Sequence, residues 1–317
     1  MKNIFTTVLF SFVALALFGQ QEPQTTQFMQ YKLGYNPAFA GSQEAAAITA
    51  IYRNQWLGLD GAPETQILSF NMPLLNQRVG VGANLVRSTI GITTTYDLDA
   101  VYAYRFRVGP GMLGLGIQGS VRSLQNEFQR TRASQPIASD PSIPANQENK
   151  FLFNFGAGVY YNTENFYIGV SIPRLIQNNI NFNEGVGDVV ISREVQHVYL
   201  MGGLILNLNE RIKLQPQALV KYVNNAPFDL DGNLSVIFDD KFIFGVTYRL
   251  GGNKNSGVGE SIDVLASAQV SKNILFGVSY DITLSELNNY SHGSIELGLH
   301  YFFGKSEGDE YVNPRFF

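Results

Sequence analysis

The sequence contains no cysteine among its 317 residues. This absence excludes disulfides, thiolate metal sites, a cysteine nucleophile and a lipid-modified N-terminal cysteine. Histidine is almost as scarce, and the three present, His197, His292 and His300, have no second histidine or carboxylate at a spacing typical of metal ligands. We therefore expect neither a metal centre nor another cofactor.

Charge is the second shortage. Charged residues make up 15% of the chain, against about 25% in typical soluble domains, whereas hydrophobic residues reach an ordinary 45%. A chain with so few charges needs a very large core or a lipid environment. The net charge of −4 does not provide the concentrated basic face that nucleic-acid binding requires.

Long hydrophobic runs are absent beyond the first twenty residues. Lys2 precedes an apolar run from Ile4 to Phe18 that ends at Gly19-Gln20. This pattern predicts a secretory signal peptide over residues 1–20. The alternative is an uncleaved anchor, but the run is shorter than the roughly twenty residues of a helical span. Any later membrane insertion must then use β-strands.

Alternating strands fill the sequence beyond Gly41. In each run an apolar face opposes a polar or small face, and the charges stay on one face: Tyr96, Leu98, Tyr102 and Tyr104 oppose Asp97, Asp99 and Arg105, and Ile295, Leu297 and Leu299 oppose Ser294, Glu296 and His300. A Lys or Arg facing lipid at the midplane of a barrel costs roughly 2–4 kcal/mol, whereas a lumen position tolerates it. This segregation therefore indicates a transmembrane barrel.

About fourteen strands are predicted, near 45–54, 64–72, 78–88, 94–107, 111–122, 151–161, 165–172, 195–207, 211–223, 229–239, 241–250, 260–270, 273–281 and 292–303. The longer polar connections follow the odd-numbered strands, and tight turns follow most of the even-numbered ones. Outer-membrane barrels have long outer loops and short periplasmic turns. We predict an all-β outer-membrane barrel over 45–303 with both chain ends in the periplasm; a soluble β-sandwich would not sort its loops so consistently.

Two segments lie outside the predicted wall. Residues 21–44 are polar and aromatic and form either a periplasmic segment or a plug, with a short helix or coil that stops at Asn36-Pro37. Residues 304–317 are expected to form a periplasmic tail.

One stretch combines features that suit recognition. Arg53-Asn54-Gln55-Trp56 holds the single tryptophan, and Gly58, Gly61 and Pro63 follow as breakers, so residues 53–65 read as a hairpin top at the long-loop end. No catalytic constellation accompanies it. Ser294 has no signature around it, and Glu296 and His300 share the lumen face of the last strand, too far apart for direct contact. We expect no enzymatic activity.

Several motifs together resemble the PorP/SprF family of type IX secretion membrane proteins. They are Gln27-Phe28-Met29 with Tyr31, the run from Asn36 to Ser42, Arg53-Asn54-Gln55-Trp56 with Gly58, Gly61-Ala62-Pro63 and Thr65, and the ending Asn313-Pro314-Arg315-Phe316-Phe317. The terminal aromatic pair departs mildly from the family, where one member would be Tyr. The resemblance spans essentially the whole mature chain.

The resemblance implies an outer-membrane component of the type IX secretion system of a diderm bacterium. Some members are core parts tied to periplasmic peptidoglycan-binding proteins. Others secrete and retain one surface adhesin, including adhesins of gliding motility, through its C-terminal domain. The candidate partner-binding residues are Asn36, Pro37, Phe39, Arg53, Asn54, Gln55, Trp56, Gly58, Gly61 and Pro63, with the loops 125–150 and 173–194 as further candidates.

Two other hypotheses stay open. The first is a passive pore or small-molecule transporter, whose lumen would be lined by residues such as Arg87, Arg105, Arg122, Lys213, Asp263 and Glu296. The second is a barrel enzyme, for which the sequence offers no triad. Trp56 itself has two interpretations, a partner-binding hot spot or an aromatic side chain that packs the hairpin against the rim.

Overall fold

The structure is a computed structural model that describes residues 22–127, 148–180, 193–224, 226, 228–251 and 259–303. The predicted signal peptide, the C-terminal tail with its Asn-Pro-Arg-Phe-Phe ending, and the centres of the loops 125–150 and 173–194 lie outside the described residues.

Strands dominate the chain. Their bounds are β1 (Ala46–Asn54), β2 (Glu64–Leu74), β3 (Val79–Ile90), β4 (Thr93–Val108), β5 (Gly111–Asn126), β6 (Glu148–Asn162), β7 (Phe166–Ile172), β8 (His197–Leu204), β9 (Leu206–Asn207), β10 (Ile212–Val223), β11 (Asp229–Phe238), β12 (Phe242–Leu250), β13 (Ser261–Ser271), β14 (Ile274–Thr283) and β15 (Ser294–Phe303). The described helices are short: η1 (Phe28–Gln30), α2 (Lys32–Tyr35), η2 (Pro37–Phe39) and η5 (Glu286–Asn289). No helix among the described residues is long and apolar enough to cross a membrane.

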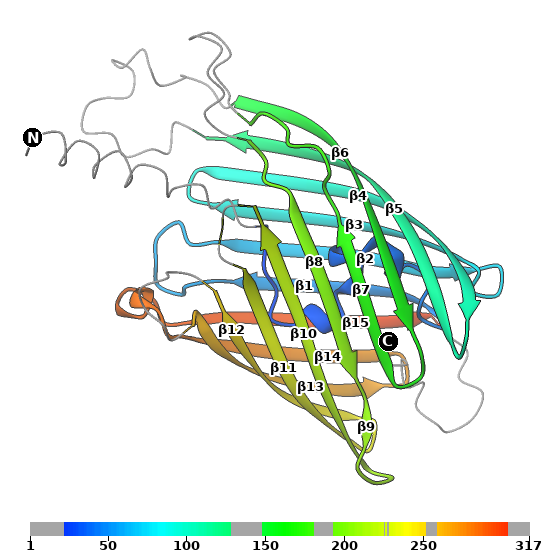
Figure 1. Ribbon diagram of the computed structural model, residues 1–317. Helices are drawn as coiled ribbons and strands as arrows, with labels where there is room; N and C mark the ends of the chain where they lie inside the picture. Colours follow the sequence, from blue (N-terminus) through cyan, green and yellow to red (C-terminus); the bar gives the residue numbers. More distant parts are fainter. Residues whose placement is uncertain are drawn as a thin grey trace, which may run out of the picture.

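The strands close into one antiparallel barrel (Figure 1). Each strand pairs with its sequence neighbours, and β1 pairs with β15 from Ala46↔Phe303 to Asn54↔Ile295, which joins the two ends of the sheet. The two-residue strand β9 continues the line of β8 along β10, so the wall consists of fourteen spans. The predicted fourteen-stranded barrel is confirmed.

Side chains alternate between lipid and lumen as predicted. On β4, Leu98 and Tyr102 point outward and are about half exposed, whereas Asp97, Asp99 and Arg105 are buried inside the barrel. The prediction that Arg87 lines the lumen is wrong. Gly80, Asn84 and Ser88 of β3 point inward, so Arg87 lies on the outer face near the end of the strand, beside Glu64, with 3.8 Å between Nη1 and Oε1.

The connections sort into two ends of the barrel, here called the long-loop end and the short-turn end. The long-loop end carries the connections β1–β2, β3–β4, β5–β6, β7–β8, β10–β11, β12–β13 and β14–β15, and the short-turn end carries the others. The turns at the short-turn end are tight; Asp239 and Asp240, both with positive φ, join β11 to β12. By the usual layout of such barrels, the long-loop end faces outward from the cell.

The N-terminal residues run through the lumen, where Figure 1 shows the helices in blue inside the ring of strands. Glu22 contacts Arg122 toward the long-loop end, and Gly41 lies against Gly80 beside the short β2–β3 turn. The two ends of the described chain therefore lie toward opposite ends of the barrel, since β15 finishes at the short-turn end. The described chain reaches β1 by crossing the lumen, and the periplasmic position expected for both chain ends stays a prediction, since the ends lie outside the described residues.

Candidate functional site

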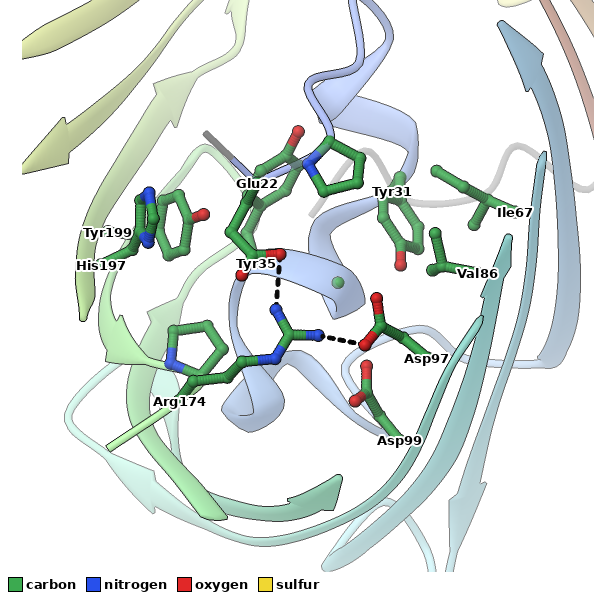
Figure 2. Close-up of a pocket in the computed structure, with 13 residues that line it drawn as sticks. Glu22, Tyr31, Tyr35, Ile67, Val86, Asp97, Asp99, Arg174, His197 and Tyr199 are labelled. Carbon is green, nitrogen blue, oxygen red and sulfur yellow. Dashed lines mark ion pairs between the residues drawn. The ribbon is translucent and has the colours of Figure 1, made fainter. Parts of the chain in front are cut away.

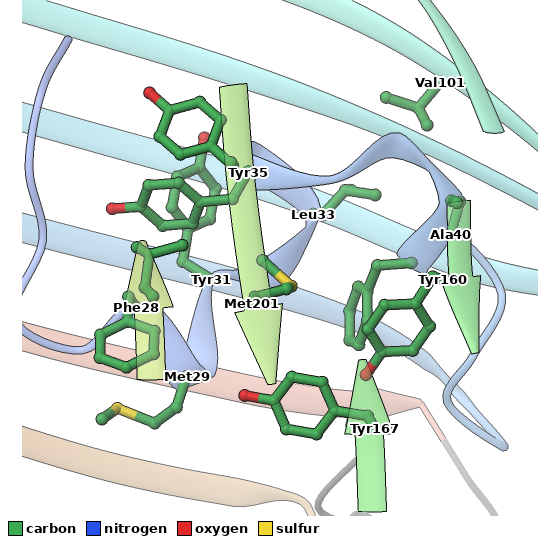
Figure 3. Close-up of a cluster of buried hydrophobic side chains, with 14 of the residues drawn as sticks. Phe28, Met29, Tyr31, Leu33, Tyr35, Ala40, Val101, Tyr160, Tyr167 and Met201 are labelled. Atoms are coloured by element: carbon green, nitrogen blue, oxygen red, sulfur yellow. The ribbon is translucent and has the colours of Figure 1, made fainter. Parts of the chain in front are cut away.

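Residues 22–42, here called the plug, fill the lumen. Phe28, Leu33 and Ala38 are at most 2% exposed, although they belong to a segment with little regular structure. Aromatic contacts attach the plug to the wall. Tyr35 meets Tyr199 edge to face at 5.3 Å between ring centroids, and Phe39 meets Tyr160 at 5.5 Å; Figure 3 shows the cluster that these residues belong to. The larger buried hydrophobic cluster of this barrel is thus built by the plug together with wall residues such as Tyr160 and Tyr199.

Toward the short-turn end the plug backbone lies directly on wall glycines. A Cβ added to Gly116 would overlap backbone atoms of Pro37 and Ala38, and one on Gly80 would overlap the Ala40 carbonyl. Glycine is required here because only a residue without a side chain allows two backbones so close. Asn36 completes the fit: its Nδ2 donates to the Val159 carbonyl at 3.0 Å, and its Oδ1 accepts from Ala38 N–H at 2.9 Å.

Lys32 is a buried cation in this half of the lumen. Its Nζ lies 4.2 Å from the centroid of the Tyr167 ring and 5.6 Å from that of Phe39. Aromatic faces attract ammonium groups, so the two rings offset part of the cost of burial. Burial nevertheless lowers the pKa of Lys32 to about 7.

Toward the long-loop end the contacts are ionic. Arg53 of β1 is 1% exposed, and its Nη2 lies 2.5 Å from Asp281 Oδ2 while its Nη1 lies 3.1 Å from Glu296 Oε2. The plug joins this cluster through its backbone and through the Thr26 hydroxyl, which accepts from Arg53 Nη1 at 2.8 Å. Glu296 accepts hydrogen bonds from Thr26 N–H at 2.9 Å and Gln27 N–H at 2.8 Å. Arg53 therefore neutralises two carboxylates, both of which hold the plug, since Asp281 Oδ1 accepts from the Thr26 hydroxyl at 2.7 Å.

The ionic contacts continue along the lumen wall. Arg249 donates to Asp231 at 2.9 Å, and Lys221 lies 2.8 Å from the other oxygen of Asp231. Gln24 of the plug donates to Asp229 at 3.2 Å. Charges buried in a protein are stable only when paired. This chain of contacts therefore means that the plug and the wall near the long-loop end stabilise each other.

A second ionic cluster surrounds Glu22 on the other side of the lumen. Arg122 of β5 donates to Glu22 at 2.9 Å, and Arg174, just beyond β7, approaches Glu22 at 2.5 Å and Asp97 at 3.2 Å. Figure 2 shows Glu22, Arg174 and Asp97 around a small lumen pocket with Tyr31 and Tyr199 on its walls. Burial alone would raise the pKa of Glu22, but Arg122 and Arg174 outweigh it and hold the pKa below its usual range.

The predicted hairpin top forms the rim at the long-loop end. Trp56 has a positive φ of 49° and is half-buried, and its N–H donates to Ser294 Oγ at 3.2 Å. Backbone hydrogen bonds tie the hairpin to its neighbours: Leu57 N–H donates to Gly293, and Gly91 N–H donates to Gly61. Hydrogen bonds between the loops therefore hold the rim in place. On its surface Leu59 is 38% exposed and Tyr290 72% exposed.

The structure divides the predicted partner-binding residues into two groups. Asn54, Gln55, Trp56, Gly58 and Gly61 lie at the rim, half-buried or exposed. The other five residues are buried, and four of them lie in or against the plug: Asn36, Pro37, Phe39, Arg53 and Pro63. The sequence motif thus combines an outward rim with internal packing.

Sequence reasoning missed the plug contacts of Glu22, Lys32, Arg174 and Asp281. One signal was available: Arg53 shares the parity of Thr49 and Ile51, which places it on the lumen face of β1. Among the described residues, no group of three or more His, Cys, Asp or Glu side chains is arranged to hold a metal ion.

A closed antiparallel wall with an apolar outside and a polar, filled lumen defines an outer-membrane β-barrel. Within this class, the chain belongs to the PorP/SprF family: the family of the type IX secretion system membrane protein PorP/SprF matches residues 17–301. The family and the fold are non-enzymatic in kind. No curated protein matches the chain significantly.

Solved structures share the fold at low sequence identity. The Ralstonia pickettii toluene transporter TbuX aligns with a TM-score of 0.52 and 9% identity, over 88% of this chain and 94% of that one. The CymD monoaromatic hydrocarbon channel aligns with a TM-score of 0.51 and 12% identity, over 91% and 95% of the two chains. Identities this low show the barrel architecture alone.

Proposed function

We propose that this type IX secretion protein helps to export a surface protein and retain it at the cell surface by binding the C-terminal domain of that protein. The client is an adhesin, of the kind used in attachment or gliding. The observation that carries the proposal is the filled lumen: the plug occupies the space a channel would need, which leaves the two ends of the barrel as the surfaces available for function.

The rim at the long-loop end is the proposed client site. Trp56, Leu59 and Tyr290 place aromatic and aliphatic surface next to exposed backbone at Gly58 and Gly61. Large aromatic side chains in rigid surroundings dominate many protein interfaces. Because hydrogen bonds connect three loops at this rim, binding there requires little ordering of the free protein.

The passive-pore hypothesis receives less support from the structure. Of the residues proposed to line a pore, Arg105, Asp263 and Glu296 are at most 1% exposed and lie in the filled lumen. We expect the purified barrel to show no steady conductance in planar bilayers.

A pull-down from detergent-solubilised outer membranes tests the client site. The tagged wild type, Trp56→Ala and Phe166→Ala are compared, with co-purifying proteins identified by mass spectrometry. Phe166 is the matched control because it is an aromatic residue, 37% exposed, at the short-turn end. We expect the wild type and Phe166→Ala to recover a large surface adhesin and Trp56→Ala to lose it.

Heat modifiability on gels reports whether each variant is still a folded barrel. Recovery of only periplasmic peptidoglycan-binding components would contradict the client role and indicate a core subunit of the secretion machinery. Loss of the folded barrel in Trp56→Ala would make the tryptophan a packing residue of the hairpin. A folded wild type with no partner and with steady conductance would favour the pore.

A further inference from the structure

Among the described strands, the pairing of the barrel wall is interrupted beside β7. β7 has seven residues and pairs with β6 only over Ala157–Asn162, although β6 itself has fifteen. Within the described ranges, no named strand pairs with the β7-facing edge of β6 from Glu148 to Gly156. Pro173 follows β7 directly and packs against Gly156, where an added Cβ would overlap the Pro173 carbonyl. Proline cannot donate to a ladder, so regular pairing ends here.

Side chains replace the missing strand. Asn154 Oδ1 accepts from the N–H groups of Phe155 and Ile176, both at 2.9 Å, and its Nδ2 donates to the Ile176 carbonyl at 2.8 Å. Asn178 Nδ2 donates to the Phe153 carbonyl at 3.0 Å. One backbone hydrogen bond, from Leu175 to Phe155, is described across this junction. We call residues 153–156 and 173–178 the seam.

The outer surface of the seam is apolar. Phe153 and Phe155 are 63% and 61% exposed, and Leu175 and Ile176 are each 44% exposed. These side chains face the bilayer, while Arg174 of the same segment points into the lumen toward Glu22 (Figure 2). The seam therefore separates the lipid from the part of the lumen near the long-loop end.

Ionic contacts connect the seam to the plug. Glu194 Oε2 accepts from Asn178 at 2.8 Å and from Asn154 at 3.3 Å, and its Oε1 accepts from Arg122 at 2.8 Å. Arg122 also binds Glu22 of the plug. Among the described residues, Arg174 pairs with Glu22 and Asp97, and the pair with Glu22 is the shorter, at 2.5 Å against 3.2 Å.

We propose that the seam between β6 and β8 is a lateral opening in the barrel wall, held shut by Glu22 of the plug through Arg174 and Arg122. When Glu22 withdraws, Arg174 loses its closer carboxylate, and the side-chain hydrogen bonds of Asn154 and Asn178 must hold the seam without it. Backbone groups in a membrane need partners, so this junction, which has few ladder bonds among the described residues, is the place where the wall opens first.

Amide hydrogen exchange of the full chain in lipid nanodiscs tests the latch. In Glu22→Gln, we expect exchange at 151–157 and 174–178 to rise roughly tenfold, while exchange in β11 and β12 stays at the wild-type rate. Glu44→Gln is the matched control, because it removes an exposed carboxylate just past the other end of the plug. It should leave the seam unchanged.

An engineered disulfide provides a second experiment. Because the chain has no native cysteine, only the two introduced residues can form it. Phe155→Cys with Leu175→Cys, two positions that share the outer face and are joined by a backbone hydrogen bond, oxidised in the Glu22→Gln chain, should return the protection of 151–157. Unchanged exchange in Glu22→Gln, or an equal rise across β11 and β12, would overturn the proposal. The wild type gives an independent check: if 153–157 is as protected as β12, the seam is not the weak part of the wall.

Discussion

The two halves of the plug are held in different ways. Near the short-turn end, backbone lies on glycine, and the fit at Gly116 and Gly80 leaves no room for a methyl group. Near the long-loop end, Glu22, Gln24, Thr26 and Gln27 are held by carboxylates and arginines of the wall. Close packing allows only one position, whereas ionic contacts depend on charge, pH and competing groups. The half of the plug near the short-turn end is thus held in a fixed position. The position of the half near the long-loop end can change with conditions.

The largest loss of stability should come from removing Arg53, which lies at the centre of the ionic contacts near the long-loop end. Arg53→Ala leaves Asp281 and Glu296 buried without their cation, and breaking a buried pair costs about 3–5 kcal/mol. We expect the denaturant midpoint of the refolded barrel to fall clearly, with earlier proteolysis of the plug. Arg211→Ala serves as the control, because its pair with Asp239 lies exposed at the short-turn end. Equal effects of the two variants would refute the central role of Arg53.

A smaller loss is expected from the packed half. Gly116→Ala forces the Pro37–Ala38 backbone away from β5, at a cost of about 3 kcal/mol, typical of severe overpacking. Gly119→Ala lies on the same strand, but its Cβ meets nothing within 4 Å and should be neutral. Urea titration of both variants, followed by fluorescence of the single tryptophan, measures the difference. Equal urea midpoints of the two variants would show that the plug near Gly116 shifts at little cost.

The smallest effect concerns pH and Lys32. Its pKa is about 7 in the seated plug and near the ordinary value of 10.5 when the plug is exposed. The unseated state therefore binds more protons between these values, and seating should strengthen as pH rises from 7 toward 10.5. Limited proteolysis of the plug at pH 7 and pH 9.5 measures this, and Lys32→Met should remove the dependence. Weaker seating at the higher pH would reverse the sign and count against a depressed pKa.

The wall was readable from the sequence because barrel strands follow a local rule. The alternation of Leu98 and Tyr102 with Asp97 and Asp99 requires no knowledge of distant residues, and the run predicted at 94–107 appears as Thr93–Val108. Arg87 shows the limit of the rule. On β3 the inward face is made of small residues such as Gly80 and Ser88, so charge alone does not mark the lumen.

The lumen contacts were not readable, because they join residues far apart in the chain. Arg53 meets Glu296 across 243 positions, and Thr26 meets the same glutamate across 270. Those meetings depend on the register in which β1 closes against β15 and on the path of the plug, neither of which leaves a periodic trace. The motif Arg53-Asn54-Gln55-Trp56 therefore looked like one recognition surface, whereas its first residue belongs to the interior.

The closure of the barrel has a consequence for the order of assembly. β1 and β15 are the first and last strands, and their junction carries Arg53 and Glu296. Glu296 accepts from the N–H groups of Thr26 and Gln27 in the plug, and Arg53 donates to the Thr26 hydroxyl. The same contacts therefore stabilise both the seated plug and the closed sheet. The last step of assembly is then one in which seating of the N-terminal residues and the meeting of β1 with β15 favour each other.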